Sequence, residues 1–501
     1  EQDHLETLVQ AIRKLVEPTQ MVDHFLVPPA KLGDVVRAIR EAGFEVRVDG
    51  ASVRVASGSQ AQVKTAIDWF EVEGGVLFDD VEVSIADALA ALARGESSVL
   101  LPNGQFGLLP DEALAPWRQL VELADQHKGT LRVKRSQAAL LDALLAARSD
   151  TRFVGDAGFV AVRDRLREFR GVAPRPAPDG FVGALRSYQQ QGLGWLWFLR
   201  ELGLGGCLAD DMGLGKTVQV LALLLDVHAD ATRQPSLLVV PRSLLDNWQR
   251  EAARFTPDLR VLDFHGADRW ARLQSAGGFG AFDLVVTTYG TVRSDAARFV
   301  EQQVRFEYVV LDEAQAIENA QSLTSKAVRL LVGEHRLALT GTPVQNHLGE
   351  LWALFEFLSP GLLGKSRAFQ QLLRAGRDGK GIDGKLLQRA LAPFLLRRTK
   401  AEVLPELPPK QELTILCELD GRQQKAYAAM RAHYQKVLLG KGGKLGPQER
   451  FVALEALLRL RQVACHEGLV DPARRADDAA KLEALLPMLR ELADGGHKAL
   501  V

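Results

Sequence analysis

Beyond residue 180 the chain alternates between short, nearly continuous apolar runs and longer segments with helical spacing of apolar positions. The apolar runs end in polar or turn residues, and they occupy residues 206–210, 237–241, 283–289, 308–313 and 336–343. Strands that are apolar on both faces are typical of a parallel sheet covered by helices on both sides. The pattern therefore predicts an α/β fold with a mostly parallel sheet, whose polar residues gather at the C-terminal strand ends, where such sheets bind ligands.

The first part of the chain has a different, mixed α/β pattern. Apolar spacing in residues 32–43 predicts a helix that stops at Gly43, and alternation across residues 44–57 predicts a hairpin around Asp49-Gly50. No catalytic constellation is recognisable here, so a docking or regulatory module is the favoured interpretation. The remaining elements expected in this region are a strand at 71–78, a helix at 84–95 and a hairpin around the Asn-Gly turn within 98–110.

Three prolines at alternate positions, Pro174, Pro176 and Pro178, predict an extended, semi-rigid connector over residues 172–180. No internal repeat is evident, which disfavours solenoids and propellers. The predicted organisation is an N-terminal α/β segment (1–68), an accessory α/β module (69–171), the connector (172–180), a P-loop lobe (181–360), helical insertions (361–480) and a last segment (481–501).

Composition narrows the function classes without naming one. With 47% hydrophobic and 25% charged residues the 501-residue chain is an ordinary globular sequence. No apolar run approaches the roughly 20 residues of a membrane span, and the acidic N-terminus is unlike a signal peptide. The three cysteines have no paired spacing, so neither a disulfide framework nor a zinc site is predicted. The net charge of −1 means that any nucleic-acid surface must be a local basic patch. We expect a cytoplasmic protein.

The strongest chemical signal is the segment GCLADDMGLGKTVQV at residues 206–220. An apolar run, a glycine-bearing turn, Lys216-Thr217 and a helical pattern together predict a strand–loop–helix phosphate cradle. In that geometry Lys216 reaches the β- and γ-phosphates of ATP, and the Thr217 hydroxyl ligates Mg²⁺. Asp210 stands where the general G-x-x-x-x-G-K-T pattern has its first glycine.

Two further positions fit a nucleotide site on the same edge of the sheet. Asp312 and Glu313 follow the apolar run YVVL, where one carboxylate can hold Mg²⁺ through water and its neighbour can activate the attacking water. The alternative for such a pair is a solvated strand end. Gln189, about 27 residues before Lys216, has an amide that donates and accepts at once, which suits an adenine edge.

Several ordered segments resemble the Swi/Snf-type remodelling ATPases of helicase superfamily 2. These are LRSYQQQGLGWL, LADDMGLGKTVQ, LLVVPRSLLDNWQREAARF, VVTTYGTV, VVLDEAQAIEN, LALTGTPVQNHLGELWALFEFLSPGLLG and FLLRRTKAEVLPELPPK. The resemblance covers roughly residues 181–501 and implies a RecA-like first motor lobe. The amino-acid sequence of residues 68–145 is similar to that of the accessory region in a bacterial group within this family.

The resemblance also implies roles for individual residues. Asp312 and Glu313 would hold the metal and polarise water, with Lys216 as the third catalytic residue. Gln315 occupies a position where many relatives carry His, and the resemblance implies for it a role in coupling hydrolysis to strand movement. The nucleotide-binding set implied is Arg186, Tyr188, Gln189, Asp211, Met212, Gly213, Leu214, Gly215, Lys216 and Thr217, and the coupling set is Gln315, Thr340, Gly341 and Thr342.

The family places duplex DNA across the same edge and contacts mostly its phosphates. The candidate contacts here are Arg242, Ser243, Thr288 and Asn346, although each could instead cap a helix or satisfy a loop. Because phosphate contacts read no bases, we expect little sequence specificity and strong salt dependence. The pair Cys465-His466 is interpreted as structural rather than metal-binding.

The resulting prediction is an ATP- and Mg²⁺-dependent translocase on double-stranded DNA, nucleoid-associated, that displaces or remodels bound proteins. Residues 481–501 resemble the helix and first strand of a second lobe, so we expect a fragment that is poorly active alone. The accessory region is expected to dock a partner or restrain the motor. The alternatives are a nucleotide-gated module without productive turnover and, less favoured, a small-molecule kinase.

Overall fold

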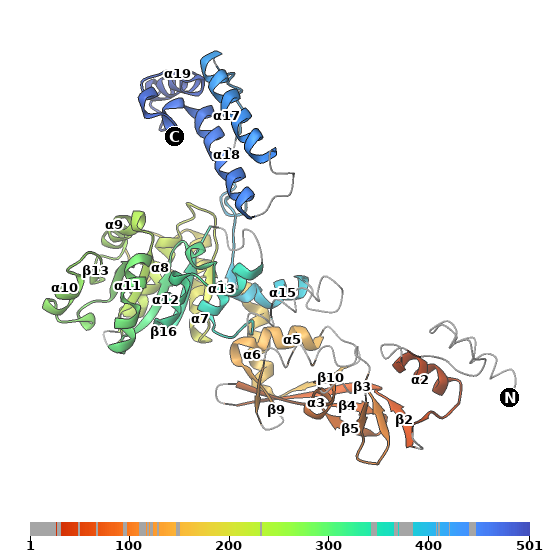
Figure 1. The fold of residues 1–501 in the computed structure, drawn as a ribbon. Helices are drawn as coiled ribbons and strands as arrows, with labels where there is room; N and C mark the ends of the chain where they lie inside the picture. The colour runs from red at the N-terminus through yellow and green to blue at the C-terminus, as the bar shows by residue number, and fades with distance from the viewer. Residues whose placement is uncertain are drawn as a thin grey trace. The chain divides into compact units, whose positions relative to one another are not determined.

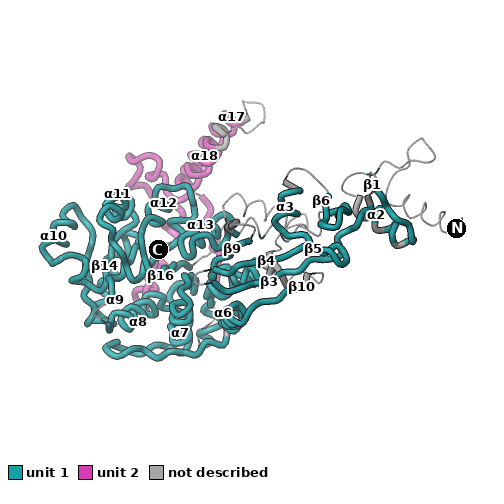
Figure 2. The backbone as a smooth tube through the Cα atoms, turned by 90° about the horizontal axis from the view of Figure 1, so that it is seen from below, with its two compact units in different colours: residues 1–406 teal, residues 407–501 magenta. Residues whose placement is uncertain are grey.

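The computed structural model spans residues 1–501 and divides into two compact units, Glu1–Glu406 and Leu407–Val501 (Figure 2). No helix in the described part is long and apolar enough to cross a membrane. The residues that the structure describes are 27, 32–48, 51–66, 69–93, 98–109, 117, 120, 124–127, 130–146, 151–230, 233–341, 348–364, 369, 384–406, 408, 411–419, 421–439 and 447–501.

The predicted parallel sheet is present in the first unit. Seven strands pair in the order β13-β14-β12-β15-β16-β11-β17, and every pair is parallel. Each apolar run beyond residue 180 forms a strand, which confirms the pattern read from the sequence. The strands are β11 (Gly206–Leu208), β12 (Ser236–Val240), β13 (Val261–Asp263), β14 (Leu284–Thr288), β15 (Arg305–Leu311), β16 (Val332–Leu339) and β17 (Leu395–Leu396).

Helices cover both faces of this sheet, as strands buried on both faces require. Figure 2 shows α7, α8 and α9 on one side of β14 and β16, with α11, α12 and α13 on the other. All residues of β12 and β14 are buried between these layers. The helices are α7 (Ser187–Glu201), α8 (Lys216–His228), α9 (Leu245–Phe255), α10 (Arg269–Ser275), α11 (Tyr289–Glu301), α12 (Leu323–Leu330), α13 (Leu348–Leu358), α15 (Gly384–Leu391) and α16 (Lys400–Val403).

An aromatic cluster anchors the β13 end of the sheet. Phe264, Trp270 and Phe299 pack with ring centroids between 5.0 and 5.9 Å apart. Burying each such side chain contributes about 1.5–3 kcal/mol. Short 3₁₀ turns complete the first unit: η2 (Arg135–Gln137), η3 (Glu168–Gly171), η4 (Arg242–Leu244), η5 (Phe279–Ala281), η6 (Ala314–Ile317) and η7 (Ala392–Phe394).

The N-terminal region forms two further sheets (Figure 1). The predicted hairpins are confirmed, because Val48 pairs with Ala51 and Leu100 pairs with Phe106. The predicted helix is α2 (Leu32–Glu41), and Gly43 follows it with φ +86°. The other elements are β1 (Arg47–Val48), β2 (Ala51–Val55), β3 (Gly58–Thr65), β4 (Trp69–Phe78), β5 (Val81–Ser84), α3 (Ile85–Ala93), β6 (Ser98–Leu100), β7 (Phe106–Leu108), β8 (Asp125–His127), β9 (Thr130–Lys134), α5 (Ala138–Ala146), β10 (Thr151–Gly155) and α6 (Ala157–Arg167).

Two predicted boundaries do not coincide with the units of the structure. The strands β3 and β4 pair antiparallel across residue 68, and β10 pairs parallel with β3, so strands on both sides of the expected boundary share one sheet. The larger division falls after Glu406 rather than within the connector at 172–180. The first difference arises because β3 ends at Thr65 and β4 begins at Trp69, so the expected boundary falls between two neighbouring strands that pair with each other.

The accessory region contacts the P-loop lobe within the first unit. The Lys134 ammonium donates to the Pro360 carbonyl at 2.8 Å, and the buried Gln137 amide donates to the Gly361 carbonyl at 2.9 Å. Both acceptors lie in the turn that follows α13. An exposed ion pair between Arg165 and Glu201 joins α6 to α7.

The second unit is helical, as predicted for this part of the chain. The helices α17 (Gly421–Leu439) and α18 (Pro447–Cys465) pack on each other and are followed by η8 (Glu467–Leu469), η9 (Pro472–Arg474) and α19 (Ala480–Asp494). His466 has a structural role: Nδ1 accepts from the Gly468 N–H, and Nε2 lies 2.9 Å from the Asp477 carbonyl. Residues 495–501 form no strand, so only the helix of the predicted helix–strand pair is present.

Candidate nucleotide-binding site

The phosphate loop joins β11 to α8 and depends on two glycines in the left-handed region. Gly213 has φ +86° and Gly215 has φ +74°, conformations that side chains disfavour. A Cβ atom on Gly215 would also lie 2.5 Å from the Gln189 Nε2 atom. Gly215 is the N-cap of α8, so the first backbone N–H groups of that helix are directed at the loop.

Lys216 and Thr217 form the start of α8. The Lys216 Nζ atom donates to the Asp210 carbonyl at 2.7 Å, which holds the ammonium over the loop. Both side chains are half-buried. A cation over a glycine-bearing loop, beside the N-terminal end of a 13-residue helix, is an arrangement suited to phosphate groups.

Asp312 follows the last residue of β15 and is buried. Its Oδ2 atom accepts a 2.7 Å hydrogen bond from the Trp248 indole, and its Oδ1 atom accepts from the Glu313 N–H at 2.9 Å. Burial is the largest influence on this carboxyl and raises its pKa above the ordinary value; the indole bond opposes the rise. Asp312 forms no ion pair with any described residue. A buried carboxylate held by neutral donors alone fits a position where a cation binds.

A chain of hydrogen bonds runs from Glu313 to the end of β16. Glu313 has φ +50°, and its Oε2 atom accepts from the Gln315 amide at 2.7 Å. Thr340 then donates from its hydroxyl to the Gln315 Oε1 atom at 3.2 Å. Residues predicted separately as catalytic and coupling groups are therefore in direct contact. Gly341 follows Thr340, whereas Thr342 and Asn346 lie outside the described residues.

Gln189 connects the first turn of α7 to the phosphate loop. Its Oε1 atom accepts from the Arg186 N–H at 2.9 Å, and its Nε2 atom donates to the Leu214 carbonyl at 3.2 Å. Tyr188 is buried, and burial raises its pKa. The Arg186 side chain is exposed and pairs with Glu406 at 3.1 Å. Both ends of the Gln189 amide thus have partners within the chain, and adenine recognition remains a prediction.

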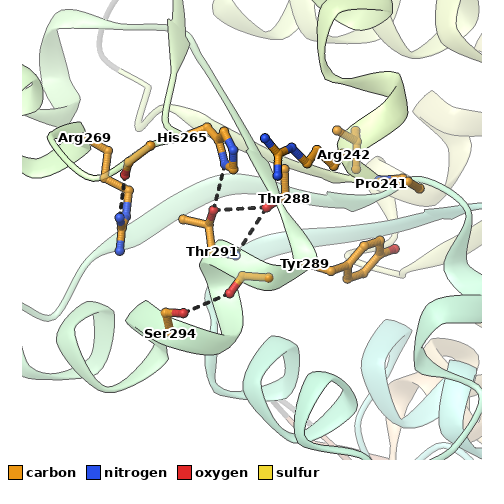
Figure 3. Close-up of a pocket in the computed structure, with 11 residues that line it drawn as sticks. Pro241, Arg242, His265, Arg269, Thr288, Tyr289, Thr291 and Ser294 are labelled. Carbon is orange, nitrogen blue, oxygen red and sulfur yellow. Dashed lines mark hydrogen bonds between the residues drawn. The ribbon is translucent and has the colours of Figure 1, made fainter.

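A separate pocket of about 380 Å³ lies at the carboxyl ends of β12 and β14 (Figure 3). Arg242 lines it with an exposed side chain and forms no ion pair with a described residue. Thr288, which ends β14, also caps α11 by accepting from the Thr291 N–H at 3.2 Å. The eleven lining residues include two arginines and no carboxylate: Val240, Pro241, Arg242, His265, Gly266, Arg269, Thr288, Tyr289, Gly290, Thr291 and Ser294.

Comparison with known proteins decides the family. The model of the SNF2-related domain matches residues 188–469. This chain belongs to the SNF2-related family. It is 37% identical over 348 residues to the putative ATP-dependent helicase/translocase YwqA of Bacillus subtilis, covering 67% of this chain and 37% of that relative. It is 35% identical to the ISWI chromatin-remodeling complex ATPase ISW2 of Saccharomyces cerevisiae, covering 64% of this chain and 30% of ISW2.

Among solved structures, the Sulfolobus solfataricus SWI2/SNF2 ATPase core in complex with dsDNA matches with a TM-score of 0.42 and 34% identity, covering 65% of this chain and 67% of that chain. The chain spans 37% and 30% of the two relatives named above. The predicted resemblance and α/β, RecA-like fold class are confirmed by the family match and the parallel sheet.

Sequence reasoning does not single out several residues that the structure places beside the candidate site and the pocket. The sequence shows Trp248 only as one residue of a family-like segment, yet its indole N–H donates to the Asp312 carboxylate. His265 and Arg269 line the pocket without having been singled out. Arg398 pairs with Asp210; the sequence signals for this pair are the departure of Asp210 from the general loop pattern and the position of Arg398 in the family-like segment FLLRRTKAEVLPELPPK. No periodicity marks such residues, because their partners are distant along the chain.

Proposed function

We propose that this chain contains the ATP-binding motor lobe of a translocase on double-stranded DNA that displaces or remodels DNA-bound proteins. The observation that carries the proposal is the convergence, on one sheet edge, of the phosphate loop, Asp312-Glu313 and the hydrogen-bond chain through Gln315 to Thr340. A phosphate site linked directly to a neighbouring strand end is what coupling hydrolysis to movement requires.

ATP is the proposed substrate, with Lys216 and the N–H groups of the loop contacting its phosphates. The Thr217 hydroxyl and the Asp312 carboxylate are the proposed holders of Mg²⁺, which when bound neutralises charge developing on the phosphates. Glu313, adjacent to Asp312, orients the attacking water. The buried Asp312 carboxylate, with neutral donors only, supports this assignment.

The pocket at the carboxyl ends of β12 and β14 is the proposed binding site for a DNA phosphate. Arg242 supplies positive charge that is unpaired among the described residues, and none of the described lining residues is a carboxylate that would repel a phosphate. Arg242 is the exposed member and the better candidate for direct contact, since Arg269 is already paired with Asp295 at 2.6 Å. Contacts of this kind position the backbone without reading bases.

The experiment measures ATP binding by this chain, and ATP turnover with and without duplex DNA by this chain joined to a second motor lobe, at about 50 and 200 mM salt. Lys216→Ala serves as the blank. Turnover stimulated by duplex DNA, weakened by salt and absent from the blank, is the expected result. ATP binding without stimulated turnover would replace this proposal by the nucleotide-gated module. Failure of the chain to bind ATP at all would refute both.

A further inference from the structure

Asp210 is the residue that departs from the general phosphate-loop pattern, and it has no exposed surface. A buried carboxylate is costly unless it is paired and hydrogen-bonded. In this structure the compensating charge is Arg398, which comes from a segment 188 residues away along the chain. The two side chains are joined through the Arg398 Nε atom to Asp210 Oδ1 at 2.9 Å and through Nη2 to Oδ2.

The same guanidinium reaches two other parts of the nucleotide site. Its Nη2 atom donates to the Gln219 Oε1 atom on α8 at 2.9 Å, and its Nη1 atom donates to the Tyr188 carbonyl on α7. Arg398 is buried, so these bonds are formed away from solvent. One planar side chain thus joins the phosphate loop, the helix after it and the first turn of α7.

Backbone contacts bring Arg398 into this position. The strand β17 pairs parallel with β11, and the segment after it runs along the loop. The Ala209 N–H donates to the Leu396 carbonyl at 2.7 Å, and the Asp211 N–H donates to the Arg398 carbonyl at 3.0 Å. Residues 396–398 therefore extend the sheet beside the first residues of the phosphate loop.

We infer that Arg398 is a positioning residue for the ATP site, acting on the phosphate loop through Asp210. The link is short: the Asp210 carboxylate is held by Arg398, and the carbonyl of the same residue accepts the hydrogen bond from Lys216. Displacing Asp210 displaces the partner of the phosphate-binding ammonium. The inference rests on the proposed ATP binding and goes beyond it by assigning a function to a segment outside the loop.

A matched pair of variants tests this inference in the full chain. Arg398→Lys keeps the charge but loses the planar fork that reaches three partners at once. Arg397→Lys makes the same change at the preceding, exposed position. Fluorescence titration with an ATP analogue should give a dissociation constant raised about tenfold or more in Arg398→Lys, against a change below about twofold in Arg397→Lys.

A purely structural role is separated from positioning by measuring affinity only where circular dichroism shows each variant to be folded. If Arg398 had only a structural role, Arg398→Lys would lower the unfolding temperature and leave the ATP affinity of the folded protein unchanged. Positioning through Asp210 also predicts non-additivity: Asp210→Asn and Arg398→Lys combined should weaken binding by less than the product of their separate effects. If Arg398→Lys does not fold, Gln219→Glu keeps the ion pair and an acceptor for Arg398 and removes only the amide donor to Asp210 Oδ2 and the Gly215 carbonyl, whereas Gln219→Leu also removes the Arg398 contact; Gln219→Leu should weaken ATP binding about threefold more than Gln219→Glu.

The outcomes separate this inference from the proposed function. If the unsubstituted chain does not bind ATP, the proposed function itself is refuted. Binding by the unmodified chain that Lys216→Ala abolishes, with Arg398→Lys folded and binding as tightly as the unmodified chain, would overturn only the role of Arg398. Additive effects of Asp210→Asn and Arg398→Lys would also overturn it.

Discussion

Replacing Trp248 by Phe should weaken the hold on Mg²⁺ at the proposed site. Trp248 lies on α9 and is 1% exposed, and its indole N–H donates to the Asp312 Oδ2 atom at 2.7 Å. Phe keeps an aromatic ring in the same buried position and removes only the donor and part of the volume. The carboxylate then keeps a single described donor, the Glu313 N–H.

The size of the effect follows from the bond that is lost. A hydrogen bond to a charged group contributes about 1.5–3 kcal/mol, and about 1.4 kcal/mol corresponds to a factor of ten. The lost hydrogen bond fixes only one of the two Asp312 carboxylate oxygens. We therefore take the lower end of the free-energy range and expect the Mg²⁺ concentration for half-maximal ATP turnover to rise by about tenfold. The pKa of Asp312, already raised by burial, should rise further without the donor. Since only the ionised carboxylate holds the metal, activity should disappear at a higher pH as the solution is acidified.

The assay is ATP turnover as a function of Mg²⁺ and of pH. Trp270→Phe is the matched control, because the Trp270 indole also donates to a buried carboxylate, Asp295 Oδ2, at 2.8 Å, in a different part of the lobe. That variant should leave the Mg²⁺ dependence unchanged. An unchanged Mg²⁺ requirement and pH profile in folded Trp248→Phe would refute the reasoning, as would an equal shift in both variants.

Three further results are expected. Arg242→Ala should weaken duplex binding for all sequences alike and lower by about 1 the slope of the logarithm of the DNA-binding constant against the logarithm of the salt concentration. Arg250→Ala, at an exposed position on α9 outside the pocket, should change neither. A loss of binding that depends on base sequence would contradict the phosphate role. Gln315→Ala removes the hydrogen bonds to Glu313 and Thr340. The stimulation of ATP turnover by DNA should then fall by about 5- to 150-fold, while the affinity for ATP is kept. Full stimulation of turnover in this variant would exclude coupling through Gln315. Burial lowers the pKa of His335 from 6.5 to about 4. The unfolded chain therefore takes up this proton at a higher pH than the folded protein does. As pH drops from about 6.5 to about 4, the free energy of unfolding should fall by up to about 1.4 kcal/mol per pH unit. His335→Phe should reduce this loss in thermal unfolding at pH 7 and 5, and an unchanged pH dependence would count against it.

Much of the first unit could be predicted because its signals are local. A parallel strand covered on both faces must be apolar throughout, so each strand end is visible as the point where polar residues return. That reasoning alone places Lys216, Asp312 and Thr340 on one edge. In the structure the charge of Lys216 acts to lower the pKa of Asp312, and Thr340 is connected to Glu313 through Gln315. The Asp-Gly and Asn-Gly turns similarly predicted both N-terminal hairpins.

Pairing between distant segments could not be predicted in this way. The shared sheet of β3, β4 and β10 crosses the boundary expected at residue 68, because strand partners are chosen by hydrogen bonding and packing in space. Thr288 was expected to contact DNA, and its buried hydroxyl caps α11 while it also lines the pocket. Whether it touches a phosphate remains a prediction.

The sequence by itself determined the class of fold, the phosphate loop and the family, since these depend on residue types at fixed short spacings. Only the tertiary structure decided why Asp210 replaces a glycine: a carboxylate can be buried at that position because Arg398, 188 residues along the chain, is brought beside it by the pairing of β17 with β11. The same holds for Trp248 and Asp312, which lie 64 residues apart. A local pattern cannot encode the cost of burying a charge, because that cost depends on the partner that the fold supplies.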